Sequence, residues 1–164
     1  MRRIVYVLLA YVLVVSCSNE SENKVTDQDV ADTVVEDAPA PINAPPYAVE
    51  YDQETQDLNL VRSKENIGKA DVDDMLRVIN AKYEGIKLDL ISSKTDTVNL
   101  RIADASKLTQ EMGSAGAEAY LAEVTFSLTE LPGIKAIKVE FEEGDHAMPG
   151  VYTREDFKNV KIKK

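Results

Sequence analysis

Cys17 is the only cysteine in the chain, and its thiol could become a thiolate nucleophile or carry a covalent lipid. It follows an apolar stretch from Ile4 to Val15, which is preceded by Arg2 and Arg3. The stretch has about 12 residues, whereas a helix needs roughly 20 to cross a bilayer. A basic start, a short apolar region and small residues at its end are typical of a secretory signal peptide. The sequence therefore predicts that the chain is exported.

The run Leu13-Val14-Val15-Ser16-Cys17 resembles the end of a bacterial lipoprotein signal. The resemblance implies cleavage between Ser16 and Cys17, so that residues 1–16 are the signal peptide and Cys17 is acylated, with palmitate among its chains. Val14 departs from the usual leucine, and the alternative is an ordinary signal peptide or an uncleaved anchor. Two or more acyl chains hold a protein stably on a membrane. Ser18 stands where an aspartate would signal inner-membrane retention, which favours the outer membrane if the source is Gram-negative.

The other side chains that could do chemistry form no complete catalytic set in the sequence. His146, the only histidine, lies in an acidic loop and could act as a base or a metal ligand, although a solvated turn is the favoured interpretation. A Ser-His-Asp triad could be assembled with Ser114 or Ser127, but neither lies in a nucleophile-elbow sequence. With Cys17 acylated, no thiol remains for catalysis or for a zinc site. We therefore expect no enzymatic activity, no cofactor and no metal.

Two motifs could bind ions, and each has a simpler structural explanation. The acids of Asp71–Asp74 suggest a calcium loop, but Leu76 and Lys82 occupy the positions where such a loop needs its glycine and its bidentate glutamate. These acids are better explained as the start of a helix, where they favour the positive end of the helix dipole. Gly113-Ser114-Ala115-Gly116 could cradle an anion, but it lacks the lysine of a P-loop. We expect it to open a helix.

The chain is acidic, with a formal net charge of −10 at pH 7. Phosphates would repel this charge, so the sequence argues against nucleic acid as a partner. Residues 17–46 contain no aromatic residue, are acidic apart from Lys24, and end in a proline-rich run. Low hydrophobicity, like charges and clustered prolines predict a disordered tether over 17–46. Residues 47–164 suit one folded domain of ordinary size.

Hydrophobic periodicity predicts an α+β domain. Strands with alternating apolar residues are expected over 47–51, 58–61, 86–90, 98–102 and 137–141, with a short strand at 151–152. Helices are expected from Asp71 to Gly85 and from 117 to Pro132. We expect a mainly antiparallel sheet with both helices packed on one face. The basic tail around Lys161 is interpreted as a solubilising end or a charged edge strand, in preference to a surface for anionic glycans or lipids.

The order of these elements resembles that of a GerMN domain, the module named for sporulation and spore-germination lipoproteins. Val98–Asp104 is similar to the family's strand that runs into a polar turn. Ala122–Ile137 is similar to its helix ending in T-L-T-x-x-P-G-V-x-x-V, with Ser127 where threonine is common. Gly150–Asp156 is similar to the closing strand, and Tyr47–Val61 fits the opening hairpin. The resemblance covers nearly the whole domain, although its first helix lacks the L-L-x-G-P of many members. It implies a module similar to ring-building modules of envelope complexes, with no catalytic residue set.

We therefore expect a lipid-anchored, non-enzymatic cell-envelope protein whose GerMN-like domain binds another protein or helps to assemble an envelope complex. The acylated Cys17 would hold it in membrane lipid, while a sheet edge and exposed helix faces would form the contact surface for an envelope protein partner. The alternative is a module that binds peptidoglycan or another cell-wall glycan. Such sites usually offer stacked aromatic residues, and this chain has no tryptophan. An envelope hydrolase is the least favoured hypothesis.

Overall fold

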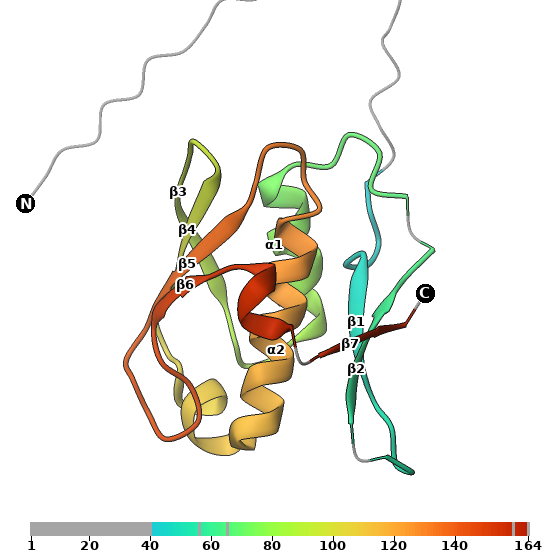
Figure 1. Ribbon diagram of the computed structural model, residues 1–164. Coiled ribbons are helices and arrows are strands. Elements are labelled where there is room, and N and C mark those ends of the chain that lie inside the picture. The colour runs from blue at the N-terminus through green and yellow to red at the C-terminus, as the bar shows by residue number, and fades with distance from the viewer. Residues whose placement is uncertain (1–40, 56, 65, 159, 164) are drawn as a thin grey trace, which may run out of the picture. The chain divides into compact units, whose positions relative to one another are not determined.

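Two β-sheets lie on either side of a helical layer in the computed structural model of the chain (Figure 1). The structure describes residues 41–164 except 56, 65, 159 and 164. Ser16, Cys17 and most of the predicted tether lie outside the described residues. Those that are described all belong to one compact unit.

The elements follow one another in the order that the hydrophobic pattern predicts. Two short helical segments, over 107–111 and 154–157, are present in addition. The first sheet contains β1 (Tyr47–Tyr51), β2 (Leu58–Arg62) and β7 (Lys161–Lys163), in that spatial order. The second contains β3 (Leu88–Lys94), β4 (Thr97–Ile102), β5 (Ala136–Glu140) and β6 (Gly150–Tyr152). The helical segments are α1 (Val72–Lys82), η1 (Lys107–Glu111), α2 (Gly113–Leu128) and η2 (Arg154–Phe157). Neighbouring strands are antiparallel except for β2–β7 and β4–β5, which are parallel.

Helix α2 forms the centre of the domain. Its residues from Ala119 to Leu128 are all buried, and an apolar surface on all sides of a helix is typical of a core position. Strands β1 and β2 contact it from one sheet and β5 contacts it from the other. The predicted α+β fold, with mainly antiparallel strands, is confirmed, and α1 and α2 both contact the four-stranded sheet, through β3 and β5. The three-stranded sheet on the other side of α2 was not predicted.

Helix α1 begins where the sequence predicts. The Asp71 carboxylate accepts a hydrogen bond from the Asp74 N–H at 2.9 Å, so it caps the helix N-terminus. The buried face of the helix consists of Met75, Leu76, Val78 and Ile79. Gly85 follows the helix with a φ of 86°, in the left-handed region that glycine adopts without strain. The acids at the start of α1 therefore have a structural explanation.

The folded domain begins earlier than residue 47, which corrects the predicted end of the tether at residue 46. Ile42 is only 2 % exposed and belongs to the hydrophobic core, and its carbonyl accepts a hydrogen bond from Arg77 at 2.8 Å. Pro46 is also buried, and its carbonyl accepts a bond from the Ser63 N–H at 2.8 Å. Proline-rich composition predicts disorder only on average, and here the end of the run is held by burial of Ile42 and Pro46 and by these hydrogen bonds.

The basic C-terminal segment forms the edge of the first sheet. Strand β7 pairs with β2 in parallel, with Ile162 opposite Leu60. Lys161 and Lys163 form ion pairs with Asp57 and Asp52, which lie in the turn between β1 and β2. The interpretation of this segment as a charged edge strand is thus confirmed.

Candidate binding groove

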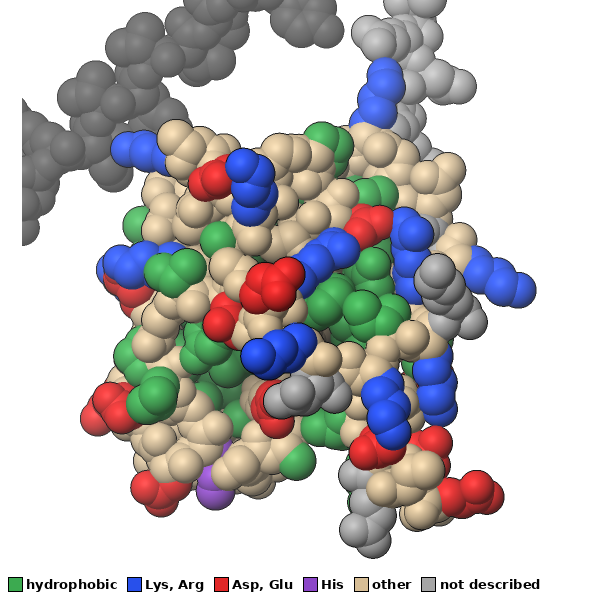
Figure 2. All heavy atoms as spheres, viewed as in Figure 1, with side chains coloured by type: hydrophobic (Ala, Val, Ile, Leu, Met, Phe, Trp, Pro, Cys, Tyr) green, Lys and Arg blue, Asp and Glu red, His purple; other side chains and the backbone are tan. Residues whose placement is uncertain are grey.

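An open groove lies between α2, the loop over 141–149, β6 and η2. Its volume is about 540 Å³. It is lined by Glu118, Leu121, Glu143, Gly144, Asp145, His146, Ala147, Met148, Tyr152 and Phe157. Figure 2 shows apolar side chains lying in recesses of the domain surface, with charged side chains around them. The groove is therefore a place where a partner could bury apolar surface.

The loop that forms one wall of the groove is fixed against η1. The N–H of His146 donates to the Thr109 carbonyl at 3.1 Å, and the N–H of Gly144 donates to the Ala147 carbonyl at 3.3 Å. Gly144 approaches Thr109 so closely that a Cβ at this position would lie 2.6 Å from the Thr109 Cβ. Only glycine fits this contact, which explains why the loop turns at Gly144.

The opposite wall of the groove comes from the last part of the chain. The rings of Tyr152 and Phe157 stack with centroids 5.9 Å apart. The Tyr152 hydroxyl donates a hydrogen bond to the carbonyl of Met148 and so ties β6 to the loop. Met148 remains exposed, at 62 %. A large exposed apolar side chain in an apolar recess is a recognised mark of an interaction surface.

The structure brings together one of the residue pairs considered for catalysis. Ser114 Oγ lies 3.2 Å from His146 Nδ1 at one end of the groove. Within the part of the chain that the structure describes, no carboxylate is hydrogen-bonded to His146, so the pair lacks the acid that orients the histidine of a triad. Ser127 lies elsewhere, fully buried in α2. The pair can offer hydrogen bonds to a ligand but does not form a catalytic triad.

The rim of the groove is acidic. Glu118, Glu143 and Asp145 line it, and all three are exposed. A second, smaller recess of about 160 Å³ shares Glu143 and adds Asp104 and Glu142. The acidic surface therefore continues from the groove across the neighbouring recess.

A buried polar cluster around Glu123 was not predicted from the sequence. Glu123 is 0 % exposed, and its carboxylate accepts bonds from Lys82 Nζ at 2.6 and 2.7 Å, from the Tyr83 hydroxyl at 2.7 Å and from the Val49 N–H at 2.9 Å. Burial, and then the negative charge of Glu123, raises the pKa of Tyr83 and also that of Tyr120. The signal that could have predicted it is a glutamate between apolar neighbours in a helix that is apolar all round.

This Glu123 cluster joins elements of the core and is closed to ligands. It ties β1 and the C-terminal end of α1 to the middle of α2. Lys82, Tyr83 and the Val49 N–H already donate to the Glu123 carboxylate, which is fully buried and therefore has no access to a ligand. We assign it to stability.

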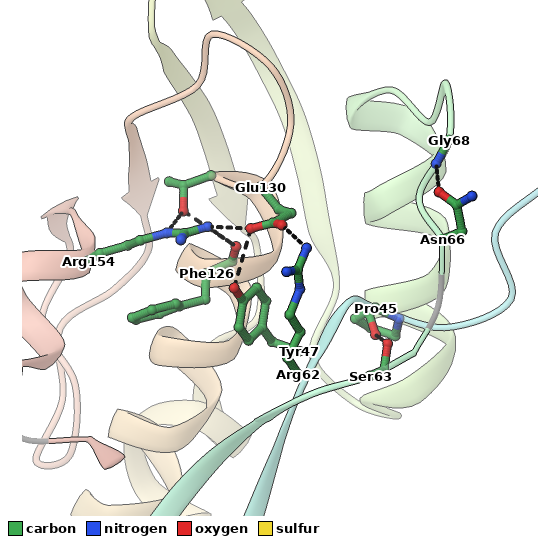
Figure 3. Close-up of polar contacts among 10 residues, drawn as sticks. Pro45, Tyr47, Arg62, Ser63, Asn66, Gly68, Phe126, Glu130 and Arg154 are labelled. Atoms are coloured by element: carbon green, nitrogen blue, oxygen red, sulfur yellow. Dashed lines mark hydrogen bonds and ion pairs between the residues drawn. The ribbon is translucent and has the colours of Figure 1, made fainter. Parts of the chain in front are cut away.

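A second cluster joins the two ends of the domain (Figure 3). Glu130 accepts bonds from Arg154 at 2.9 Å, from the Tyr47 hydroxyl at 3.3 Å and from Arg62. The Arg154 guanidinium also lies 4.9 Å from the centre of the Phe126 ring, in cation–π geometry. Burial pushes the pKa of Glu130 up, but the bond from Arg154 and the charges of both arginines outweigh it and hold the pKa below its ordinary value. This cluster fastens η2, and with it the aromatic wall of the groove, to the end of α2.

Residues 41–164, with the four gaps noted above, contain no group of three His, Cys, Asp or Glu side chains placed to hold a metal ion. Among the same residues, no helix has the length and apolar character needed to cross a membrane. No family model, curated protein or solved structure matches the chain. The resemblance to GerMN domains therefore stays a prediction.

Proposed function

We propose that this chain is a lipid-anchored, non-enzymatic cell-envelope protein whose folded domain binds another protein. The observation that carries the proposal is the apolar groove, with Met148 exposed at its margin. Of the two surfaces expected from the sequence, α2 offers no free apolar face because it is buried on both sides. Strand β6 lies at the edge of its sheet and pairs, within the described residues, with β5 alone. The sheet edge and the groove together form the proposed contact surface.

The resemblance to GerMN domains supports a role in assembling an envelope complex. A glycan-binding module is the weaker alternative because the groove offers a single partly exposed aromatic ring, that of Tyr152, while Phe157 beside it is almost fully buried. A protein segment needs apolar contacts and a strand edge, and the groove offers both.

Photo-crosslinking in cells tests the protein-binding role. A photoreactive amino acid is placed at Met148 of the full chain, expressed at native level, and its adducts are identified by mass spectrometry. Tyr51 is the matched control, because it is similarly exposed, at 58 %, but lies on the other sheet. We expect a discrete protein adduct from Met148 and none from Tyr51. Adducts confined to glycan, or the same adducts from both positions, would contradict the proposal.

The anchor is tested separately through Cys17. We expect Cys17→Ser to abolish acylation and to release the chain from the membrane fraction, because the remaining apolar stretch is too short to span a bilayer. Fractionation of cells and metabolic labelling with palmitate measure both effects. A Cys17→Ser chain that stays in the membrane fraction would favour an uncleaved anchor instead.

A further inference from the structure

We infer that the groove accepts an extended segment of a partner protein that presents both apolar side chains and Lys or Arg side chains from one face. This inference rests on the proposed protein-binding function and adds the chemistry of the partner. It follows from three features of the groove: its apolar floor, its unpaired acidic rim and its position beside a strand edge.

The floor requires apolar side chains from the partner. Leu121 and Phe157 are almost fully buried at the bottom of the groove, and Met148 stands exposed at its margin. A polar segment would bury little of this apolar surface. Each apolar side chain that enters the groove instead removes apolar area from water. The floor alone would accept many partners, so the rim must supply the selectivity.

The rim requires positive charge from the partner. No Lys or Arg lines the groove. Glu118, Glu143 and Asp145 form no ion pair with any residue that the structure describes. Some carboxylates elsewhere in the domain are paired, as Asp57 is with Lys161 and Asp96 with Lys135. The groove instead places three unpaired negative charges around an apolar surface.

A divalent cation fits these acids less well than a basic peptide does. In the described part of the chain, no three carboxylate or imidazole side chains are placed to share one metal ion. Glu118 lies on α2, while Glu143 and Asp145 lie on the loop, so the three charges are distributed along the groove. Charges distributed in this way match several basic side chains along an extended backbone.

The strand edge favours an extended conformation. Strand β6 is antiparallel to β5, and no other described strand pairs with its second edge. A segment added to that edge would gain backbone hydrogen bonds and place alternate side chains toward Tyr152 and the groove. The intervening residues would point to the opposite face of the sheet, so the apolar and the basic side chains must both lie at the alternate positions that face the groove.

Selection from a random peptide display library on the full chain tests this inference. We expect enriched peptides with a net positive charge and interspersed apolar residues, whose affinity falls as ionic strength rises from about 0.01 M to about 0.15 M. In fluorescence anisotropy, the triple variant E118Q/E143Q/D145N should bind them about tenfold more weakly. The matched control E50Q/E54Q/D73N removes the same charge from three exposed acids outside the groove and should bind as the unaltered chain does. Met148→Ser should also weaken binding.

The outcomes separate the inference from the function on which it rests. Neutral or acidic peptides that bind, and lose affinity with Met148→Ser, would overturn the basic partner while keeping the groove as a protein-binding site. Equal losses in both triple variants would assign the binding to net charge and overturn the inference. Enriched peptides that are insensitive to every groove variant would overturn both proposals.

Discussion

At the scale of single residues, the buried carboxylate of Glu123 holds three elements together. Its donors come from β1, from α1 and from the residue that follows α1. Removing it would leave the Lys82 ammonium, the Tyr83 hydroxyl and the Val49 N–H without their partner in the core. A buried donor without a partner costs more than the bond itself contributed.

We expect Glu123→Ala to lower the free energy of unfolding by about 3 kcal/mol, as measured by urea denaturation. Asp89→Ala is the control, because Asp89 pairs with Lys87 at 2.8 Å while its own side chain is half exposed and that of Lys87 is largely exposed. That change should have an effect of at most about 0.5 kcal/mol. Equal effects of the two substitutions would show that the Glu123 carboxylate does not hold these three elements together.

Tyr83 and Tyr120 are neighbours in the core, so replacing each with phenylalanine removes a hydroxyl from similar surroundings. The rings of Tyr83 and Tyr120 meet edge to face with centroids 4.8 Å apart. The Tyr83 hydroxyl donates to Glu123, whereas the buried Tyr120 hydroxyl has no hydrogen-bond partner among the described residues. We expect Tyr83→Phe to destabilise the domain by about 1.5 kcal/mol and Tyr120→Phe to be neutral or stabilising. Urea midpoints of the two variants check this, and the reverse order would contradict it.

At the scale of elements, local patterns predict the hairpins and helices but not what covers them. The alternation of Leu88, Leu100 and Ile102 predicts β3 and β4, and the Asp71 cap predicts the start of α1. Helix α2 begins at Gly113, four residues before the predicted start. Thr125 and Ser127 are fully buried in α2 because strands of two different sheets contact this helix. The hydrophobic periodicity of a single segment does not show which distant segments will cover it.

Strand β7 and the groove show the same limit. A short basic segment is compatible with an edge strand, but its parallel partner β2 lies about 100 residues earlier, and periodicity does not identify which strand it joins. The loop with Gly144 and His146 was predicted as a loop. The groove also needs Leu121 from α2 and Phe157 from η2, and only the tertiary fold brings these segments together.

The loop wall of the groove depends on the close contact between Gly144 and Thr109. We expect Gly144→Ala to destabilise the domain by about 2 kcal/mol, because Thr109 is buried and cannot move away from the new Cβ without strain. Gly150→Ala is the control, since a Cβ at Gly150 meets nothing within 4 Å. Thermal unfolding and crosslinking from Met148 measure the loss of stability and of groove shape. A tolerated Gly144→Ala would show that the loop is not fixed by this contact.

At the scale of the whole molecule, the core keeps its phenols neutral. Tyr83 and Tyr120 have an ordinary pKa near 10.0 in the unfolded chain, and burial followed by the charge of Glu123 raises both values in the folded domain. The stability from their burial is therefore fully present below pH 10.0. It is lost as pH rises, because the unfolded chain releases these protons first.

We expect the free energy of unfolding to fall above about pH 10 by roughly 1.4 kcal/mol per pH unit for each of these tyrosines. Urea denaturation at a series of alkaline pH values measures the slope, and tyrosinate absorbance follows the ionisation. The double variant Y83F/Y120F should flatten this slope, while Tyr51→Phe, which removes an exposed phenol, should leave it unchanged. If both phenols ionise near pH 10 while the domain stays folded, the core around Glu123 is open to solvent. A closed core instead links ionisation to unfolding, so the two signals should change together.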